Sequence, residues 1–229
     1  MQNPIIVALD VPTAEAALRL AGELAPAVGA FKIGSELFTS AGPDLVRRVR
    51  DLGAPVFLDL KFHDIPNTVS KAVAAALRLE VQMLTVHTSG GLAMLQAAEQ
   101  AAQAQQPAPL VLGVTVLTSM DTATLGEIGV AAEAGAQVER LARLAVRAGL
   151  RGLVCSPLEV ALLRRVLPAA IQLVTPGIRA EGDAVGDQKR TLSAREAIAA
   201  GSSWLVIGRP ICAAPSPRAA AERILASLG

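Results

Sequence analysis

The chain has 229 residues, and its hydrophobic content of 52% is enough for one large core or two small ones. Its 21 Lys and Arg residues nearly balance its 20 Asp and Glu residues, and a net charge of +1 gives no general field for holding nucleic acid or an anionic membrane surface. Aromatic residues make up 2% of the chain, too few for the stacking surfaces of single-strand binding proteins. We therefore expect no nucleic-acid partner and no membrane partner.

Short apolar runs alternate with longer helical patterns along the chain. Each apolar run is nearly continuous, which is typical of parallel strands buried on both faces. Strands are predicted at Ile5–Leu9, Ala30–Ile33, Pro55–Leu60, Met83–Val86, Leu110–Val116, Gly152–Cys155, Ile171–Thr175 and Trp204–Ile207. Helices are predicted at Ala14–Leu24, Pro43–Leu52, Thr68–Leu79, Leu92–Gln103, Val138–Ala148, Leu158–Val166, Ala194–Ala200 and Pro217–Leu228.

Strand followed by helix, repeated about eight times, predicts an α/β protein with a (β/α)8 TIM barrel. A doubly wound open sheet is the structural alternative. No Pro-, Gly- or Ser-rich linker divides residues 1–229, so we expect a single domain. The segment Gly177–Leu192 is polar and long for a strand-to-helix loop, and loops of that kind in compact domains are usually functional.

The N-terminus and the cysteines favour a cytoplasmic protein. Met1-Gln2-Asn3-Pro4 lacks the basic residues and the apolar run of a secretory signal. No run approaches the roughly 18–20 apolar residues of a membrane span. Two cysteines, Cys155 and Cys212, do not make a disulfide framework, and Cys155 is predicted to be a small buried apolar residue.

Charged residues gather where the second and third apolar runs end. Asp59 and Lys61 are two positions apart, so their side chains share a face of an extended segment. Lys32 ends the neighbouring strand, and Asp64 lies three residues beyond Lys61. These four residues predict an alternating Lys–Asp–Lys–Asp array. A salt-bridge network at the barrel mouth is the alternative, but exposed ion pairs stabilise a fold by only about 0–1 kcal/mol.

The last two strands are followed by residues suited to holding an anion. Gly177 and Gly208 allow backbone N–H groups to approach a ligand closely, and Arg179 and Arg209 offer forked donors. Gln188 adds an amide. Barrels often bind phosphate in the loops after strands 7 and 8, which is where these residues fall. An ordinary solvated loop position is the alternative for Arg179.

The histidines make a weak case for a metal site. His63 and His87 are the two histidines of the chain, and a metal site needs several His, Asp or Glu side chains that converge. We expect structural or supporting roles for both, and no metal.

A ten-residue segment, Asp59-Leu60-Lys61-Phe62-His63-Asp64-Ile65-Pro66-Asn67-Thr68, closely resembles the signature of the orotidine 5′-phosphate decarboxylase family. Other segments resemble that family in order along the chain: Ala8-Leu9-Asp10, Phe31-Lys32-Ile33-Gly34, Val86-His87-Thr88-Ser89-Gly90-Gly91, Val114-Thr115-Val116-Leu117-Thr118-Ser119, Thr175-Pro176-Gly177-Ile178-Arg179, Gly186-Asp187-Gln188-Lys189-Arg190 and Ile207-Gly208-Arg209-Pro210. The Asp-x-Lys-x-x-Asp core alone is shared with related sugar-phosphate decarboxylases and aldolases. The other segments make the resemblance more specific.

The resemblance implies decarboxylation of orotidine 5′-phosphate to UMP, the last step of UMP synthesis de novo, without a metal or a cofactor. It also implies a homodimer in which Asp64 and Thr68 enter the site of the partner subunit. By position, Lys61 is the proton donor to C6, and Asp59, Lys32 and Asp64 of the partner subunit complete the charge array.

The resemblance also implies the substrate contacts. Asp10 and Lys32 meet the ribose hydroxyls with help from Thr68, and Thr118 lies beside the nucleotide. The phosphate is held, and the lid closed, by Arg179, Gln188, Gly208 and Arg209.

The sequence departs from the family pattern at a few positions. Glu80 stands where the family usually has glycine, Thr88 replaces a common alanine, and Leu192-Ser193 replaces a frequent Thr-Pro. Two other functions stay open: a metal-dependent sugar-phosphate decarboxylase or aldolase on the same barrel, and a non-catalytic nucleotide-binding barrel.

Overall fold

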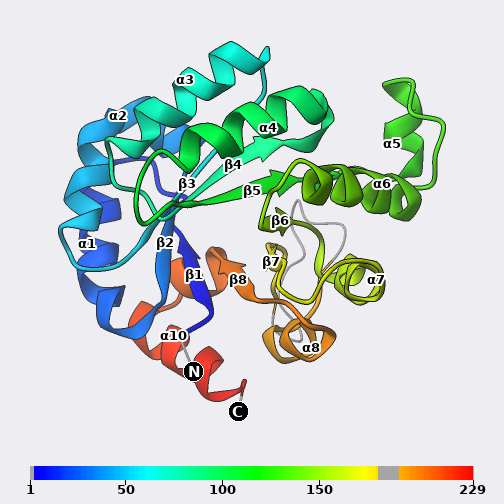
Figure 1. Ribbon diagram of the computed structural model, residues 1–229. Coiled ribbons are helices and arrows are strands. Elements are labelled where there is room, and N and C mark those ends of the chain that lie inside the picture. The colour runs from blue at the N-terminus through cyan, green and yellow to red at the C-terminus, as the bar shows by residue number, and fades with distance from the viewer. Residues whose placement is uncertain (1–2, 180–190, 229) are drawn as a thin grey trace.

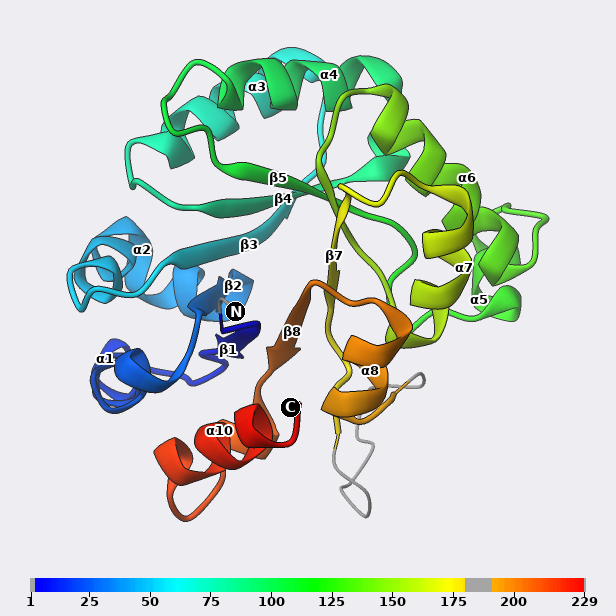
Figure 2. The same ribbon diagram turned by 60° about the horizontal axis from the view of Figure 1, so that its bottom comes forward.

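Eight parallel strands pair in chain order and close into a barrel (Figure 1 and Figure 2). The computed structural model describes residues 3–179 and 191–228. Strand β1 (Ile5–Ala8) pairs with β2 (Ala30–Gly34) on one side and with β8 (Trp204–Ile207) on the other. The other strands are β3 (Val56–Phe62), β4 (Met83–His87), β5 (Leu110–Val114), β6 (Gly152–Val154) and β7 (Gln172–Thr175). The barrel prediction is confirmed, and the open-sheet alternative is wrong because β1 and β8 are hydrogen-bonded neighbours.

Helices surround the barrel, as Figure 2 shows. They are α1 (Ala14–Leu24), α2 (Ser35–Arg50), α3 (Pro66–Leu77), α4 (Gly91–Ala102), α5 (Thr122–Glu127), α6 (Ala134–Arg147), α7 (Val160–Val166), α8 (Ala194–Ala200), α9 (Arg209–Cys212) and α10 (Pro217–Ala226). Short 3-10 turns lie at Ala25–Ala27, Thr88–Gly90 and Pro157–Glu159. None of the helices in the described part of the chain is long and apolar enough to cross a membrane.

Helix α2 differs from its prediction. The predicted helix Pro43–Leu52 is only the second half of α2, which begins at Ser35 directly after β2. Gly42 interrupts it with φ 69°, a left-handed conformation that glycine adopts without strain. Proline at position 43 is favoured at the first turn of a helix, so the sequence pattern marked the restart rather than the true beginning. Helices α5 and α9 were not predicted at all.

The core has two parts. Inside the barrel, eight residues pack on one another: Ile6, Ala8, Ala30, Phe57, Met83, Leu112, Val174 and Val206. A larger cluster lies between the strands and the helices, and small residues such as Ala17, Ala98 and Ala145 are fully buried in it. Alanine-rich helix faces allow close approach to the sheet, which is how a chain with few aromatic residues fills its interior. Three residues of the inner cluster, Ala8, Phe57 and Val206, also line a cavity at the carboxyl ends of the strands.

The structure shows how Glu80 is accommodated where the family usually has glycine. Glu80 follows the end of α3 with φ 55°, in the left-handed region where glycine is normally favoured. The Glu80 carboxylate forms an ion pair with Arg50 of α2. A glutamate at this position therefore gives up backbone freedom for a contact between α2 and the turn that follows α3.

Candidate active site

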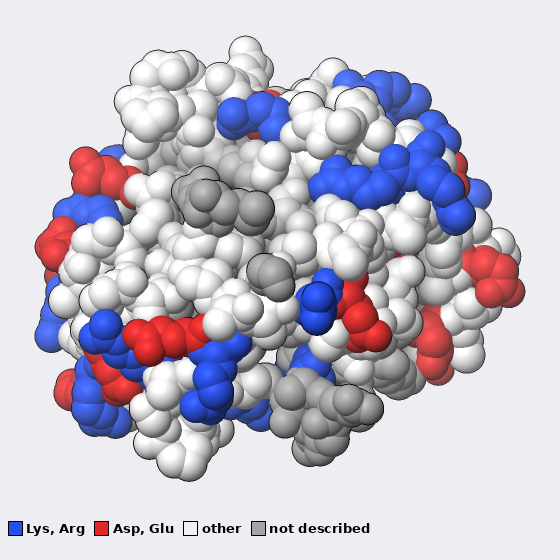
Figure 3. Space-filling view, turned by 90° about the horizontal axis from the view of Figure 1, so that it is seen from below, with Lys and Arg blue, Asp and Glu red and all other residues white. Residues whose placement is uncertain are grey.

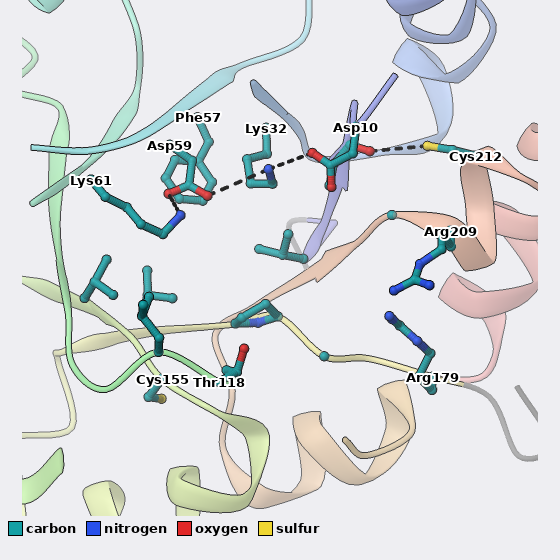
Figure 4. Close-up of a pocket in the computed structure, with 18 of the residues that line it drawn as sticks. Asp10, Lys32, Phe57, Asp59, Lys61, Thr118, Cys155, Arg179, Arg209 and Cys212 are labelled. Carbon is teal, nitrogen blue, oxygen red and sulfur yellow. Dashed lines mark hydrogen bonds and ion pairs between the residues drawn. The ribbon is translucent and has the colours of Figure 1, made fainter. Parts of the chain in front are cut away.

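A cavity of about 660 Å³ lies at the carboxyl ends of the strands. This volume is in the range of small-molecule sites. Figure 4 shows its walls, to which β1, β2, β3, β5, β6, β7 and β8 or the loops after them contribute. Its polar lining residues are Asp10, Lys32, Asp59, Lys61, Thr118, Cys155, Arg179, Arg209 and Cys212.

Four side chains of alternating charge line one wall of this cavity (Figure 4). Lys32 Nζ lies 3.0 Å from Asp10 Oδ1 and 3.7 Å from Asp59 Oδ2, and Lys61 Nζ donates to Asp59 Oδ1 at 2.9 Å. The Lys32 and Asp59 side chains are 11% and 13% exposed, whereas those of Lys61 and Asp10 are 34% and 60% exposed. The two inner groups are therefore compensated from both sides, and the Lys61 ammonium is the cationic end that reaches the open cavity.

The register of the first three strands produces this order. Ala8 pairs with Lys32, and Gly34 pairs with Asp59, so the charged residues come level at the same end of the barrel. A Cβ atom on Gly34 would lie only 3.0 Å from Lys32 Nζ. The absence of a side chain at position 34 thus leaves the room that the Lys32 ammonium occupies.

The Asp59–Lys61 contact is confirmed, but the backbone that brings the two side chains together is not regularly extended. Strand β3 continues to Phe62, and its register against β4 shifts between Leu58 and Phe62. Lys61 has φ 52°, which is rare for a residue with a side chain. A conformation of this kind costs of order 1–3 kcal/mol and persists only where surrounding contacts hold it.

Thr85 supplies such contacts, and it was not among the residues predicted from sequence. This residue of β4 is fully buried. Its hydroxyl donates to Asp59 Oδ1 at 3.0 Å and accepts the Lys61 backbone N–H at 2.9 Å. The available signal was a lone threonine inside the apolar run Met83–His87. That signal could not name its partners, because they lie 24 and 26 residues away.

Two arginines stand on the other side of the cavity. Figure 4 shows the guanidinium groups of Arg179 and Arg209 pointing toward each other across the ends of β7 and β8. Arg179 Nη1 donates to Ile178 O at 2.7 Å, which restrains its guanidinium group. Both arginines line the same cavity, and two like charges held at one place attract an anion.

The two glycines at this end differ. Gly177 has φ 79° and therefore needs a residue without a Cβ. A Cβ on Gly208 would meet Ala8 and Asp10 only at 3.5 and 3.6 Å, which are ordinary contacts. The fold itself thus requires glycine at 177, while the packing around Gly208 leaves space for more than a hydrogen atom.

Both ends of the segment 177–192 lie beside each other. Ile178 and Leu192 form a parallel bridge, and Arg179 N–H donates to Leu192 O at 3.0 Å. Ser193 then caps α8 by accepting from Glu196 N–H. Gln188 lies outside the described residues, so its predicted contact stays a prediction.

Asp64 and Thr68 do not reach the cavity of their own chain. Both are exposed, and Asp64 Oδ1 accepts the Ile65 N–H at 2.6 Å. Within the chain, Asp10 rather than Asp64 supplies the outer carboxylate of the alternating array. The position of Asp64 and Thr68 in the site of a partner subunit stays a prediction.

The histidine pair lies next to Lys61 but outside the cavity lining. The rings of His63 and His87 are 5.4 Å apart and tilted by 43°. Burial lowers the pKa of His87 below its ordinary value, and the nearby His63 and Lys61 lower it further. Across residues 3–179 and 191–228, no three His, Cys, Asp or Glu side chains are arranged to hold a metal ion.

The two cysteines both line the cavity. Cys155 is 1% exposed, in agreement with its prediction as a buried residue. Cys212 Sγ donates to Ala8 O at 3.4 Å. Burial, with a smaller effect of Asp10, raises the pKa of Cys212 from 9.0 to about 11.

The face seen from below carries both acidic and basic side chains, with a band of basic side chains at its upper right in Figure 3. In Figure 3, acidic and basic side chains both occur on this face, and uncharged residues separate them over much of it. This pattern agrees with the net charge of +1. The positive charge at Arg179 and Arg209 is a local feature of the cavity.

Comparisons with known proteins agree on one family. The model of the orotidine 5′-phosphate decarboxylase / HUMPS family matches residues 3–224. The chain is 54% identical over 228 residues to orotidine 5′-phosphate decarboxylase of Opitutus terrae, covering 100% of this chain and 99% of the relative. It is 53% identical over 226 residues to the protein of that name from Dichelobacter nodosus, covering 99% of each.

Solved structures agree with the sequence relatives. The crystal structure of orotidine 5′-phosphate decarboxylase from Lactobacillus acidophilus superposes with a TM-score of 0.88 at 36% identity, covering 99% of both chains. The structure of the protein of that name from Pyrococcus horikoshii gives a TM-score of 0.80 at 25% identity, covering 98% of both chains.

Proposed function

The chain belongs to the orotidine 5′-phosphate decarboxylase / HUMPS family, and on that premise we propose that it is the enzyme that converts orotidine 5′-phosphate to UMP and CO₂. The reaction would be the last step of UMP synthesis de novo. The observation that carries the proposal is the Lys61 ammonium, held by Asp59 at 2.9 Å on the wall of a cavity whose opposite side carries two arginines. A cation facing an anion-binding pair suits a substrate with a reacting carboxylate and a distant phosphate.

The decarboxylation requires a fixed positive charge near C6 rather than a group that accepts electrons. When the bond from C6 to the carboxylate breaks, CO₂ leaves and the electron pair stays in an in-plane sp² orbital at C6. The π-system of the pyrimidine cannot delocalise that pair. The Lys61 ammonium stabilises the developing negative charge and then transfers one N–H proton to C6, and solvent returns a proton to the amine.

Asp59 holds the ammonium in place for this step. Its carboxylate contacts both Lys61 and Lys32, so it is fixed before substrate arrives. A preorganised charge needs no reorganisation as the carbanion develops, and preorganisation of this kind provides much of the rate enhancement in many enzymes. Repulsion between Asp59 and the substrate carboxylate would add ground-state destabilisation.

The phosphate supplies binding energy far from C6. Arg179 and Arg209 would grip it, with the backbone at Gly208 and the Gln188 amide completing the contact. Segment 177–192 would close over it as a lid, for which the Ile178–Leu192 bridge forms a base. Binding energy of this remote kind offsets the cost of desolvating the charged wall.

The nucleoside would lie between the two groups. Asp10 and Lys32, already paired at 3.0 Å, would meet the ribose hydroxyls, and Thr118 would contact the nucleotide from the loop after β5. We also propose a homodimer in which Asp64 and Thr68 reach the site of the partner subunit. Exposed Asp64 and Thr68, with the 65% exposed Ile65 between them, leave this stretch of surface open for such a contact. A cytoplasmic location also remains a prediction.

The test is to follow the loss of orotidine 5′-phosphate absorbance with purified protein, with and without EDTA. We expect turnover that EDTA does not change. Turnover that EDTA abolishes would favour the metal-dependent sugar-phosphate enzymes of the same barrel. Tight UMP binding without turnover would favour a non-catalytic binding protein.

A further inference from the structure

We propose that Thr85 is a positioning residue that sets the conformation of Lys61 and the orientation of Asp59 through one hydroxyl group. Thr85 lies on β4 and does not line the cavity, so it would act on the reaction only through these two residues. The inference rests on the proposed function for its kinetic readout. Its structural readout is independent of that function.

The Thr85 hydroxyl joins the backbone of one site residue to the side chain of another. A threonine hydroxyl has one proton to donate and lone pairs to accept. Here the proton goes to Asp59 Oδ1 at 3.0 Å, and the oxygen accepts the Lys61 backbone N–H at 2.9 Å. Both hydrogen bonds thus reach β3 across the strand interface, at the place where the β3–β4 register shifts.

The register shift and the left-handed Lys61 backbone need such a restraint. In a regular ladder, the Lys61 N–H would pair with a backbone carbonyl of a neighbouring strand. With φ 52° it turns instead to the Thr85 side chain. Thr85 is 0% exposed, so water cannot take over either hydrogen bond without repacking. Removing the hydroxyl would leave a buried donor unpaired and release the strained residue.

One atom, Asp59 Oδ1, links the Thr85 hydroxyl to the Lys61 ammonium. Asp59 Oδ1 accepts from both the Thr85 hydroxyl and the Lys61 ammonium, so the three groups fix one another's positions. A small displacement of a reacting group is costly in rate, because catalysis depends on orientation at the reacting atom. Substrate binding by Arg179 and Arg209, on the other side of the cavity, would be little affected.

The experiment compares three variants with the unmodified protein. Thr85→Val keeps the shape and removes both hydrogen bonds, while Thr85→Ser keeps the hydroxyl. Thr88→Val is the matched control: Thr88 is also fully buried, but its hydroxyl donates to Val114 O, at 2.7 Å, away from the charged wall. Each protein is tested for its melting temperature, UMP affinity, and kcat and KM with orotidine 5′-phosphate.

For Thr85→Val we expect a kcat reduced by roughly 10- to 100-fold, with KM and UMP affinity within about 3-fold. Thr85→Ser should recover most of the lost kcat, and Thr88→Val should keep it. A purely structural role would lower the melting temperature of Thr85→Val without lowering kcat, and that result would overturn the proposal. Equal loss of kcat in Thr85→Ser and Thr85→Val would overturn it as well.

Two further measurements keep the test decisive. If Thr85→Val does not fold, Thr85→Cys keeps a weak donor of similar size, and its kcat should fall at least about 3-fold with UMP affinity retained. A crystal structure of the folded variant reports on positioning without any turnover. Lys61 should leave the left-handed conformation or lose its contact with Asp59, and an unchanged Lys61 would refute the proposal. Absence of turnover in the unmodified protein would instead count against the proposed function.

Discussion

Lys61 Nζ lies 2.9 Å from Asp59 Oδ1, although the two residues belong to one strand and the backbone at Lys61 is left-handed. The contact joins an almost buried carboxylate to an ammonium that is 34% exposed. This combination keeps the ammonium oriented and accessible to a ligand at the same time. It is the arrangement on which the first prediction depends.

Replacing Lys61 by alanine should abolish turnover while leaving the fold intact. Loss of both the stabilising charge and the proton donor should lower kcat by at least about 10³-fold. The circular dichroism spectrum and melting temperature should stay close to those of the unmodified protein, because the Lys61 side chain lies on the cavity wall rather than in the core. Near-normal turnover by a folded Lys61→Ala protein would rule out the proposed chemistry.

Replacing Arg209 by alanine should mainly weaken binding of the phosphorylated substrate. A lost charge-assisted contact to phosphate corresponds to roughly a 10- to 100-fold increase in KM. The inhibition constant of UMP should rise in parallel, and that of uridine, which lacks the phosphate, should not change. An unchanged KM for orotidine 5′-phosphate would contradict the assignment of the phosphate site.

A mixture of Asp64→Ala and Lys61→Ala proteins should be more active than either alone. If Asp64 crosses a dimer interface, each heterodimer contains one site with both native residues and one site with neither. Refolding the two variants together should therefore recover up to about a quarter of the native activity at equal amounts, since half of the dimers are mixed and each has one intact site. Tagged subunits confirm that heterodimers are present, and no recovery in such a sample would argue against crossing.

Cys212 should alkylate slowly and should make stability depend on pH only in the alkaline range. Its thiol is favoured in the protonated form because burial raises the pKa from 9.0 to about 11. Well below pH 9 the thiol is almost entirely neutral in both folded and unfolded chains, and stability is unaffected. Between pH 9 and about 11 the unfolded chain ionises first, so stability falls there.

At pH 8 the reaction of Cys212 with iodoacetamide should be roughly 100-fold slower in the native protein than in urea, because the thiolate fraction is smaller by that factor. Mass spectrometry of the peptide that contains Cys212 gives both rates. Equal rates in the native and unfolded proteins would show that the site does not bury the thiol.

Arg164 should matter for stability although it does not line the cavity. Its guanidinium donates to Gly201 O at 2.9 Å, Ile171 O at 2.7 Å and Ser203 Oγ at 3.0 Å, so it connects α7 to the chain before β7 and β8. Arg164→Ala removes the donor to the carbonyls of Gly201 and Ile171 and should lower the free energy of unfolding by about 2–3 kcal/mol. Arg165→Ala, at the exposed neighbouring position, should change it by less than about 0.5 kcal/mol. Equal effects in urea unfolding would contradict this role.

The barrel could be predicted from the sequence because its strands are continuous apolar runs. The run from Ile5 and the run from Trp204 are both buried and parallel, but only pairing data show that they are neighbours. The start of α2 could not be predicted correctly, because Pro43 is typical of a first helical turn although the helix begins at Ser35. The short helix α5 was missed because its six residues carry no clear helical period.

The candidate site was predictable as a set of residues, but not in its geometry. Charged residues that follow apolar runs can be recognised without knowledge of the fold. Asp59, Lys61 and Arg209 are residues of this kind. The left-handed Lys61 backbone and its restraint by Thr85 depend on a register shift between two strands. Periodicity cannot reveal such a shift, because it assumes that every residue of a strand is extended.

Closure of the ring has a consequence for the timing of synthesis. Asp10 follows the first strand and Arg209 follows the last, and Cys212 touches Ala8 across 204 positions of the chain. While β8 is still inside the ribosome, β1 lacks one of its two neighbouring strands and the cavity lacks one wall. The pocket therefore cannot form until β8 has left the exit tunnel, and ligand affinity should appear only after that point.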